Sequence, residues 1–206
     1  VAVVGEPVDS RGWNRALRAT DPGEMRLGLA GAQWMRSDHS ARLVQRLLRL
    51  RPDLDLVPVW TEQVLDREHL GPLLHDLGRL GVADAAVLPR TADEATALLD
   101  DIDVLAVTAP DHEHPSAVWG AIASGVPVVC FSTHRVAPDV DDETGVVVDY
   151  LDVPAMADAV LALHEDGPDA PATLAARRAA LRERDVGVVG RLLLDAVHRR
   201  QATEAP

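Results

Sequence analysis

The chain has 206 residues, a formal net charge of −13 and 47% hydrophobic residues. This length suits one large domain, or one domain with an accessory segment, with a substantial buried core. A broad basic surface for nucleic acid is excluded, because phosphate neutralisation requires clustered cations, so we expect no nucleic-acid partner.

The first half of the chain alternates short apolar runs with helical patterns. A strand predicted at 25–31 is followed by a helix at 40–50, whose apolar residues recur at helical spacing. Pro52 ends this helix, and a second strand is predicted at 54–60. The next elements are a helix that stops at Gly81, a third strand and a short helix, predicted at 67–81, 85–89 and 92–101.

The second half continues the alternation. A continuous apolar run at 102–109 predicts a strand that is buried on both faces. The helix predicted at 115–124 stops at Ser124 and Gly125, because glycine tolerates a positive φ without a Cβ clash. The remaining elements are strands predicted at 126–131 and 145–150, and helices predicted at about 154–163 and 174–199.

The steady alternation predicts an α/β fold, a doubly wound, Rossmann-like parallel sheet with helices on both faces. Ligands in such sheets bind beyond the carboxyl ends of the strands, so we expect the crevice beside 108–115. The helix that starts there points free N–H groups into the crevice, which suits a phosphate or pyrophosphate. Pro115, Ser116 and Ala117 are the expected contacts at this helix start.

The single cysteine, Cys130, lies in an apolar run and is interpreted as a small buried hydrophobe. One cysteine makes no internal disulfide, which favours a reducing compartment. The sequence shows neither a leader pattern nor an apolar stretch of 18 residues. We therefore predict a cytoplasmic location, with peripheral attachment to the inner membrane face left open.

Three stretches, in this order, resemble one family: "LPRTADEATALLDDIDVLAVTAP", "EHPSAVWGAIASGVPVV" and "APDVDDETGVVVDYLDVPAMADAVLAL". They are similar to the C-terminal, nucleotide-sugar-binding half of the retaining group 1 (family 4-like) glycosyltransferases of the GT-B fold. The resemblance spans about 80–165, and "VVGEPVDSRGW" at 3–13 resembles the interdomain linker of that family.

The resemblance implies a domain organisation. Residues 1–24 would be a linker-like segment, 25–165 the nucleotide-sugar-binding domain and 166–206 a C-terminal helical segment. The N-terminal acceptor-binding domain would be missing from this chain. The opening "VAVV" is also typical of the middle of a fold, so we expect a fragment or an excised domain.

The resemblance also implies the activity. A hexosyl unit would pass from a nucleoside diphosphate sugar donor to an acceptor hydroxyl with retention. The implied partners are this donor, an acceptor that is a glycan, a lipid or a small molecule, and the missing acceptor domain; no cofactor is expected. The amides near Pro115 would stabilise the departing diphosphate. The catalytic residues are unknown.

Particular positions match the donor-binding motifs of the family. The donor-binding residues implied are Arg90, Thr91, His112, Glu113, Pro115, Ser116, Ala117, Thr144 and Gly145. Arg36, the only cation of the 31–40 loop, is the implied phosphate contact. Thr91 fits a helix cap equally well. Gly145 equally fits the start of a strand after a tight turn.

The family motif has two glutamates, and the sequence has His112 and Gly120 at the corresponding positions. Glu113 is placed to replace the first, whereas Gly120 offers no oxygen to a ribose hydroxyl. This departure favours an alternative, a catalytically degenerate domain that acts in partner binding or regulation. A nucleotide-sugar epimerase of the same architecture is a third hypothesis, with only His112 and Glu113 to supply its catalytic groups.

Two further patterns are open to more than one interpretation. His112 and His114 flank Glu113, but no second cluster of suitable spacing accompanies them, so no metal site is predicted. The tryptophans invite a carbohydrate-stacking role, although core packing is the prediction for Trp119. They are Trp13, Trp34, Trp60 and Trp119.

Overall fold

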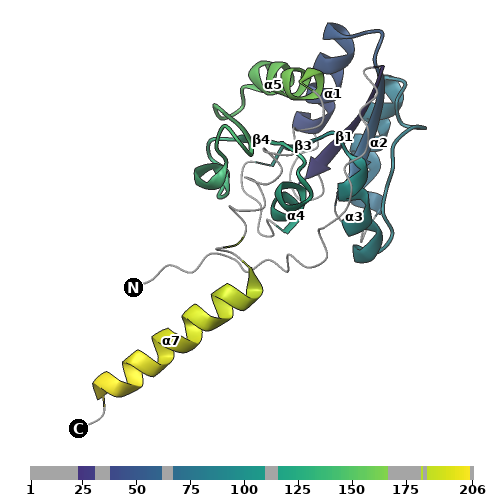
Figure 1. Ribbon diagram of the computed structural model, residues 1–206. Helices are drawn as coiled ribbons and strands as arrows, with labels where there is room; N and C mark the ends of the chain where they lie inside the picture. Colours follow the sequence, from purple (N-terminus) through teal and green to yellow (C-terminus); the bar gives the residue numbers. More distant parts are fainter. Residues whose placement is uncertain are drawn as a thin grey trace.

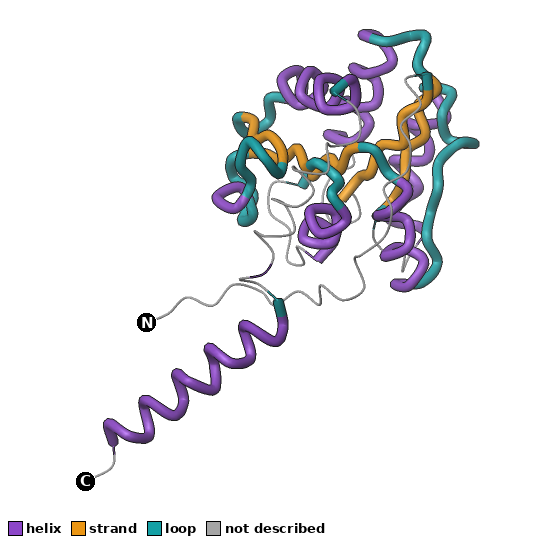
Figure 2. Tube along the Cα trace, viewed as in Figure 1, coloured by secondary structure: helices purple, strands orange, loops and turns teal. Residues whose placement is uncertain are grey.

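The computed structural model describes residues 23–30, 38–61, 67–109, 116–166, 182 and 185–204. Within these residues, the chain forms a five-stranded sheet in the order β2-β1-β3-β4-β5. All neighbouring strands are parallel. Helices cover both faces of the sheet, as Figures 1 and 2 show. The predicted doubly wound α/β fold is confirmed.

The strands alternate with helices along the chain. The strands are β1 (Glu24–Ala30), β2 (Asp55–Trp60), β3 (Val104–Val107), β4 (Val128–Phe131) and β5 (Gly145–Val148). The helices are α1 (Asp38–Leu50), α2 (Arg67–Arg79), α3 (Ala92–Leu98), α4 (Ser116–Ser124), α5 (Val153–Glu165) and α7 (Val186–Glu204). Two 3₁₀ turns are η2 (Leu99–Asp101) and η3 (Ala137–Asp139).

Two hydrophobic cores fill the space between the sheet and its helices. Successive side chains of a strand point to opposite faces, and β3 shows this clearly. Val104 and Ala106 join the core shared with α1, α2 and α5, whereas Leu105 and Val107 join the core shared with η2 and α4. All four side chains are buried, which confirms the prediction of a strand covered on both faces.

The predicted third strand, 85–89, is wrong as a full strand. Only a parallel bridge between Val87 and Val59 forms outside β2. The Val87 amide donates to the Pro58 carbonyl at 2.9 Å, so the backbone of Pro58 faces this outer edge. Proline has no N–H to donate there, and Pro89 has none to donate in return. The hydrogen-bond ladder therefore stops after one residue.

The end of α4 follows the prediction. Gly125 has a φ of +82°. Its amide donates to the Ile122 carbonyl at 3.0 Å, and the Val126 amide donates to the Ala121 carbonyl at 2.8 Å. This pair of hydrogen bonds is the Schellman arrangement that glycine permits after a helix. The chain thus reverses at once into β4.

Cys130 on β4 is fully buried, and burial raises the pKa of its thiol from 9.0 to about 11. We expect a disulfide reagent such as DTNB at pH 8 to modify Cys130 at least about 100-fold more slowly in the native protein than in urea, because two pKa units reduce the thiolate about 100-fold. Rapid labelling of the native protein would contradict the buried position of Cys130.

The same pKa shift should lower the free energy of unfolding as pH rises from 9 towards 11, since the thiol of the unfolded chain ionises first.

Candidate functional site

The sheet order places a topological switch point at the carboxyl ends of β1 and β3. From β1 the chain moves outward to β2, whereas β3 lies on the other side of β1 and leads on to β4. Ala30 and Val107 are paired at the ends of β1 and β3. The helices that follow these strands, α1 and α4, contribute to different cores and so cover opposite faces. Ligands of open α/β sheets bind at such a switch point.

A buried hydroxyl pair lies directly at this switch point. The Thr108 hydroxyl donates to the Ala30 carbonyl at 3.4 Å, and the Ser40 and Thr108 hydroxyl oxygens are 2.7 Å apart. Either hydroxyl can be the donor of the hydrogen bond between Ser40 and Thr108. Both side chains are buried. The first turn of α1 is thereby tied to the ends of β1 and β3.

Sequence reasoning missed these two residues. The available signal was a hydroxyl directly after an apolar strand, and it occurs twice. Thr61 follows β2 and donates to the Leu29 carbonyl at 3.3 Å, just as Thr108 follows β3 and donates to Ala30. Each hydroxyl adds a second hydrogen bond to a carbonyl at the end of β1, which already accepts from the backbone amide of the same threonine, at 3.4 Å for Leu29 and 3.2 Å for Ala30.

Three rings form a row along the same edge of the sheet. Phe131, the last residue of β4, is fully buried. The His39 ring meets it edge to face at a centroid distance of 5.9 Å, and the Tyr150 ring does so at 6.0 Å. This ring row, His39–Phe131–Tyr150, therefore runs from the start of α1 to the turn after β5. Sequence reasoning also missed it, because these rings lie on three separate segments.

Comparison with known proteins assigns the family. The sequence model described as "Glycosyl transferases group 1" matches residues 24–166. The chain belongs to the group 1 glycosyltransferases. The membership expected from the sequence is thus confirmed. No curated protein sequence matches the chain.

Several solved glycosyltransferases share the fold of this group 1 member. A glycosyltransferase from Rickettsia africae ESF-5 aligns with a TM-score of 0.75 at 11% identity, over 99% of this chain and 58% of that one. The lipopolysaccharide outer core galactosyltransferase WaaB aligns with a TM-score of 0.70 at 11% identity, over 97% and 56%. Anabaena Alr3699/HepE in complex with UDP and glucose aligns with a TM-score of 0.67 at 17% identity, over 86% and 49%. The chain spans about half the length of these proteins.

In this group 1 domain, α4 starts at Ser116, at the helix start expected to face a diphosphate. Ala117 is buried in its first turn, and Gly120 is buried further along the helix. Four implied contacts, Arg36, His112, Glu113 and Pro115, lie outside the described residues. Contact between the α4 amides and a donor therefore stays a prediction.

The Arg90–Thr91 pair begins α3. The Thr91 hydroxyl accepts from the Glu94 amide at 3.1 Å, while the Glu94 carboxylate accepts from the Arg90 amide at 2.6 Å. Thr91 is thus the N-cap of α3, which is the helix-cap role weighed for it, and the Glu94 carboxylate binds the amide of the residue before the cap. The Arg90 side chain is exposed. Its contact with a nucleotide stays a prediction.

Thr144 and Gly145 lie at the amino end of β5, away from the carboxyl edge of the sheet. The Asp141 carboxylate accepts from the Thr144 hydroxyl at 2.8 Å within a tight turn. A Cβ at Gly145 would collide with the backbone carbonyl of Val128. These contacts give both residues a structural role, and their contact with a donor stays a prediction.

The two described tryptophans are core residues. Trp60 is fully buried and Trp119 is nearly so, as expected for Trp119. Trp13 and Trp34 lie outside the described residues. Within the described ranges, no three His, Cys, Asp or Glu side chains gather as metal ligands. None of the helices described is both long and apolar enough to cross a bilayer.

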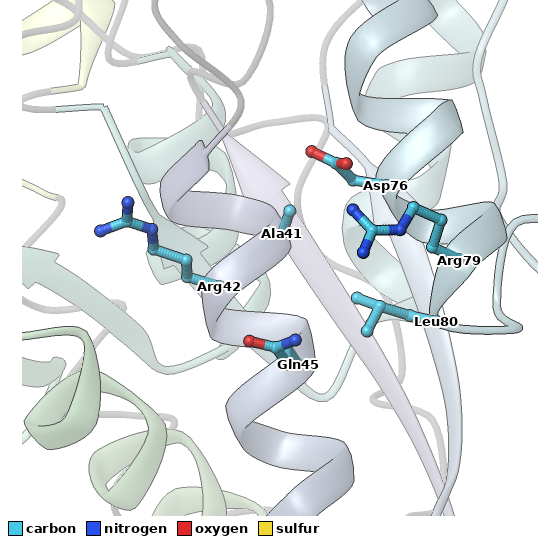
Figure 3. Close-up of a pocket in the computed structure, with 6 residues that line it drawn as sticks. All are labelled: Ala41, Arg42, Gln45, Asp76, Arg79 and Leu80. Atoms are coloured by element: carbon cyan, nitrogen blue, oxygen red, sulfur yellow. The ribbon is translucent and has the colours of Figure 1, made fainter.

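A separate hollow of about 260 Å³ lies between α1 and α2. Its lining residues are Ala41, Arg42, Gln45, Asp76, Arg79 and Leu80. Figure 3 shows Asp76 and Arg79 directed towards α1, whereas Arg42 points away from both. Among the described residues, none of the predicted donor contacts lines this hollow.

Proposed function

We propose that this domain binds a nucleoside diphosphate sugar at the switch point between β1 and β3. As part of a group 1 glycosyltransferase, it transfers a hexosyl unit to an acceptor hydroxyl with retention. The acceptor is a glycan, a lipid or a small molecule, held by the acceptor-binding N-terminal domain of such an enzyme. Family membership over residues 24–166 supports the proposal. The UDP and glucose bound by Alr3699/HepE support a nucleotide-sugar donor.

The observation that carries this proposal is the position of α1 and α4 at the switch point. Both helices start at the carboxyl edge of adjacent strands, one on each face of the sheet. Their first amides lack partners within the helix, and a diphosphate supplies the negative oxygens that such amides favour. The domain would thus stabilise the charge that develops on the leaving diphosphate.

The Ser40–Thr108 hydrogen bond makes part of this switch point preformed. It ties the first turn of α1 to the residue directly after β3. A preformed site loses less conformational freedom when it binds its ligand. Thr108 therefore positions the site, and its hydroxyl does not itself touch the donor.

The test is calorimetric titration of the domain with UDP, GDP and their hexose conjugates. At least one of them should bind, and Thr108→Val should weaken that binding by about three- to tenfold, since a lost hydrogen bond is worth about 1 kcal/mol. Thr108→Ser keeps the hydroxyl and should bind like the natural chain. The proposal is wrong if none of these nucleotides binds at millimolar concentration.

One observation favours the second candidate, a degenerate domain for partner binding or regulation. Gly120 occupies the position that resembles the second family glutamate, and it is buried in α4. A ribose would then lack one carboxylate partner. Nucleotide binding that stays millimolar while a protein partner binds at micromolar concentration would favour this candidate.

A further inference from the structure

We propose that Tyr150, with the carboxylates of Asp149 and Asp152 beside it, binds the ring of a neutral sugar. The inference rests on the proposed function, because it adds a sugar subsite to the same edge of the sheet. It starts from an exposed aromatic ring. Tyr150 is 47% exposed. It is the only tyrosine of the chain, in which aromatic residues make up 3% of the sequence, so an exposed aromatic ring is notable here.

The Tyr150 ring is held in place from below. Its edge-to-face contact with Phe131 has an interplanar angle of 83°, and Phe131 is itself immobilised by full burial. His39 meets Phe131 from another segment at an interplanar angle of 76°. A ring supported in this way loses little freedom on binding, which favours its use as a stacking surface.

The backbone next to Tyr150 adopts an unusual conformation. Leu151 has a φ of +66°, a region that residues with a Cβ seldom enter. The turn is fixed around it: the Asp152 amide donates to the Asp149 carbonyl at 3.0 Å, and the Val153 amide donates to the Leu151 carbonyl at 2.8 Å. Non-glycine residues in such conformations cluster at binding sites, where the surrounding structure maintains them.

The charge of the turn selects the ligand. Asp149 and Asp152 are exposed and flank the ring in sequence, and the Asp152 side chain also accepts from the Ala155 amide at 2.9 Å. A carboxylate has about four acceptor positions, so Asp152 can accept further hydrogen bonds. Carboxylates repel phosphate but accept from hydroxyl groups. A neutral sugar suits both the ring and the carboxylates. The apolar face of its ring would stack on Tyr150, and its hydroxyl groups would donate to the carboxylates.

The ring row connects this turn to the switch point. His39 precedes Ser40, the residue whose hydroxyl pairs with Thr108 at the switch point. Three strand spacings separate β1 from β5, which is about 14 Å. The diphosphate and the neutral sugar therefore bind at opposite ends of one edge, the former near helix starts and the latter beside carboxylates.

The test uses the single tyrosine as a reporter. With ¹³C-labelled tyrosine, the ring signals belong to Tyr150 alone. The protein is titrated with the methyl glycosides of glucose, galactose, mannose and N-acetylglucosamine, with UDP-glucose and with UDP. We expect the signals to shift with at least one methyl glycoside and not with UDP. A shift with methyl glycosides assigns the subsite to an acceptor sugar. A shift with UDP-glucose alone would contradict the separate positions of diphosphate and sugar, because the hexose of UDP-glucose is bonded directly to its diphosphate.

Variants add an affinity measurement. Tyr150→Ala should weaken binding of the sugar that shifts the signals by about three- to tenfold, whereas Tyr150→Phe keeps the ring and should bind like the natural chain. Leu192→Ala serves as the control, because Leu192 is equally exposed, at 47%, but lies on α7. The inference is overturned if no sugar shifts the ring signals, or if UDP alone does. Failure of the proposed function is separate, because it appears as absent nucleotide binding while the methyl glycosides still report on Tyr150.

Discussion

Gly145→Ala is expected to destabilise the domain by roughly 3 kcal/mol, near the top of the range for overpacked sites. Gly145 is the first residue of β5 and pairs with Val128 of β4. An added Cβ would overlap the Val128 carbonyl, carbon and nitrogen, all of which are backbone atoms. A side chain could rotate away, but the backbone of a buried strand cannot move without disturbing the ladder. Urea denaturation should show a lower midpoint with an unchanged slope.

Gly78→Ala is the matched control for this prediction. Gly78 lies in α2, and a Cβ there would meet only the Ala83 side chain at an ordinary distance of 3.9 Å. Alanine is the better helix former by about 1 kcal/mol, so this variant should be as stable as the natural chain or more stable. A Gly145→Ala protein within 1 kcal/mol of the natural chain would show that β4 and β5 do not approach this closely.

Trp60→Ala is expected to cost about 3–5 kcal/mol, the usual range for removing a large buried aromatic side chain. Trp60 is fully buried in the core shared with α1, α2 and α5. Natural domains are stable by about 5–15 kcal/mol, so such a loss would leave a marginal fold. Thermal and urea unfolding followed by far-ultraviolet circular dichroism measure it.

Trp60→Phe separates the volume of this side chain from its polar group. The indole Nε1 has no hydrogen-bond partner among the described residues. Phenylalanine removes this buried donor while it keeps most of the ring, so the cost should be about 1–2 kcal/mol. If Trp60→Phe costs as much as Trp60→Ala, the indole N–H makes a hydrogen bond that stabilises the fold.

The elements that were predicted best are those in which local chemistry and packing agree. The end of α4 could be predicted from Gly125, because the residue type alone indicates where a positive φ is allowed. The third strand was predicted wrongly because the run at 85–89 has the composition of a strand but lies beside the segment of β2 that contains a proline. Pro58, some thirty residues earlier, removes the donor that the run needed. A local pattern does not reveal which strand will lie beside it.

The site was predictable only in outline, for the same physical reason. The carboxyl edge of the sheet follows from the alternation of elements, and α4 starts there as expected. The Ser40–Thr108 pair depends on a contact between residues 68 positions apart, and the ring row joins three segments. Thr144 and Gly145 matched a motif, but strand direction places them at the other end of β5.

Pro58 also affects how the domain behaves among many copies of itself. An exposed sheet edge is a template on which strands of neighbouring molecules can add, and this leads to aggregation. On the outer side of β2, a foreign strand would meet the Val87 bridge and a proline that offers no donor. The residue that ends the ladder within the domain therefore also protects the β2 edge from the addition of a strand of another molecule.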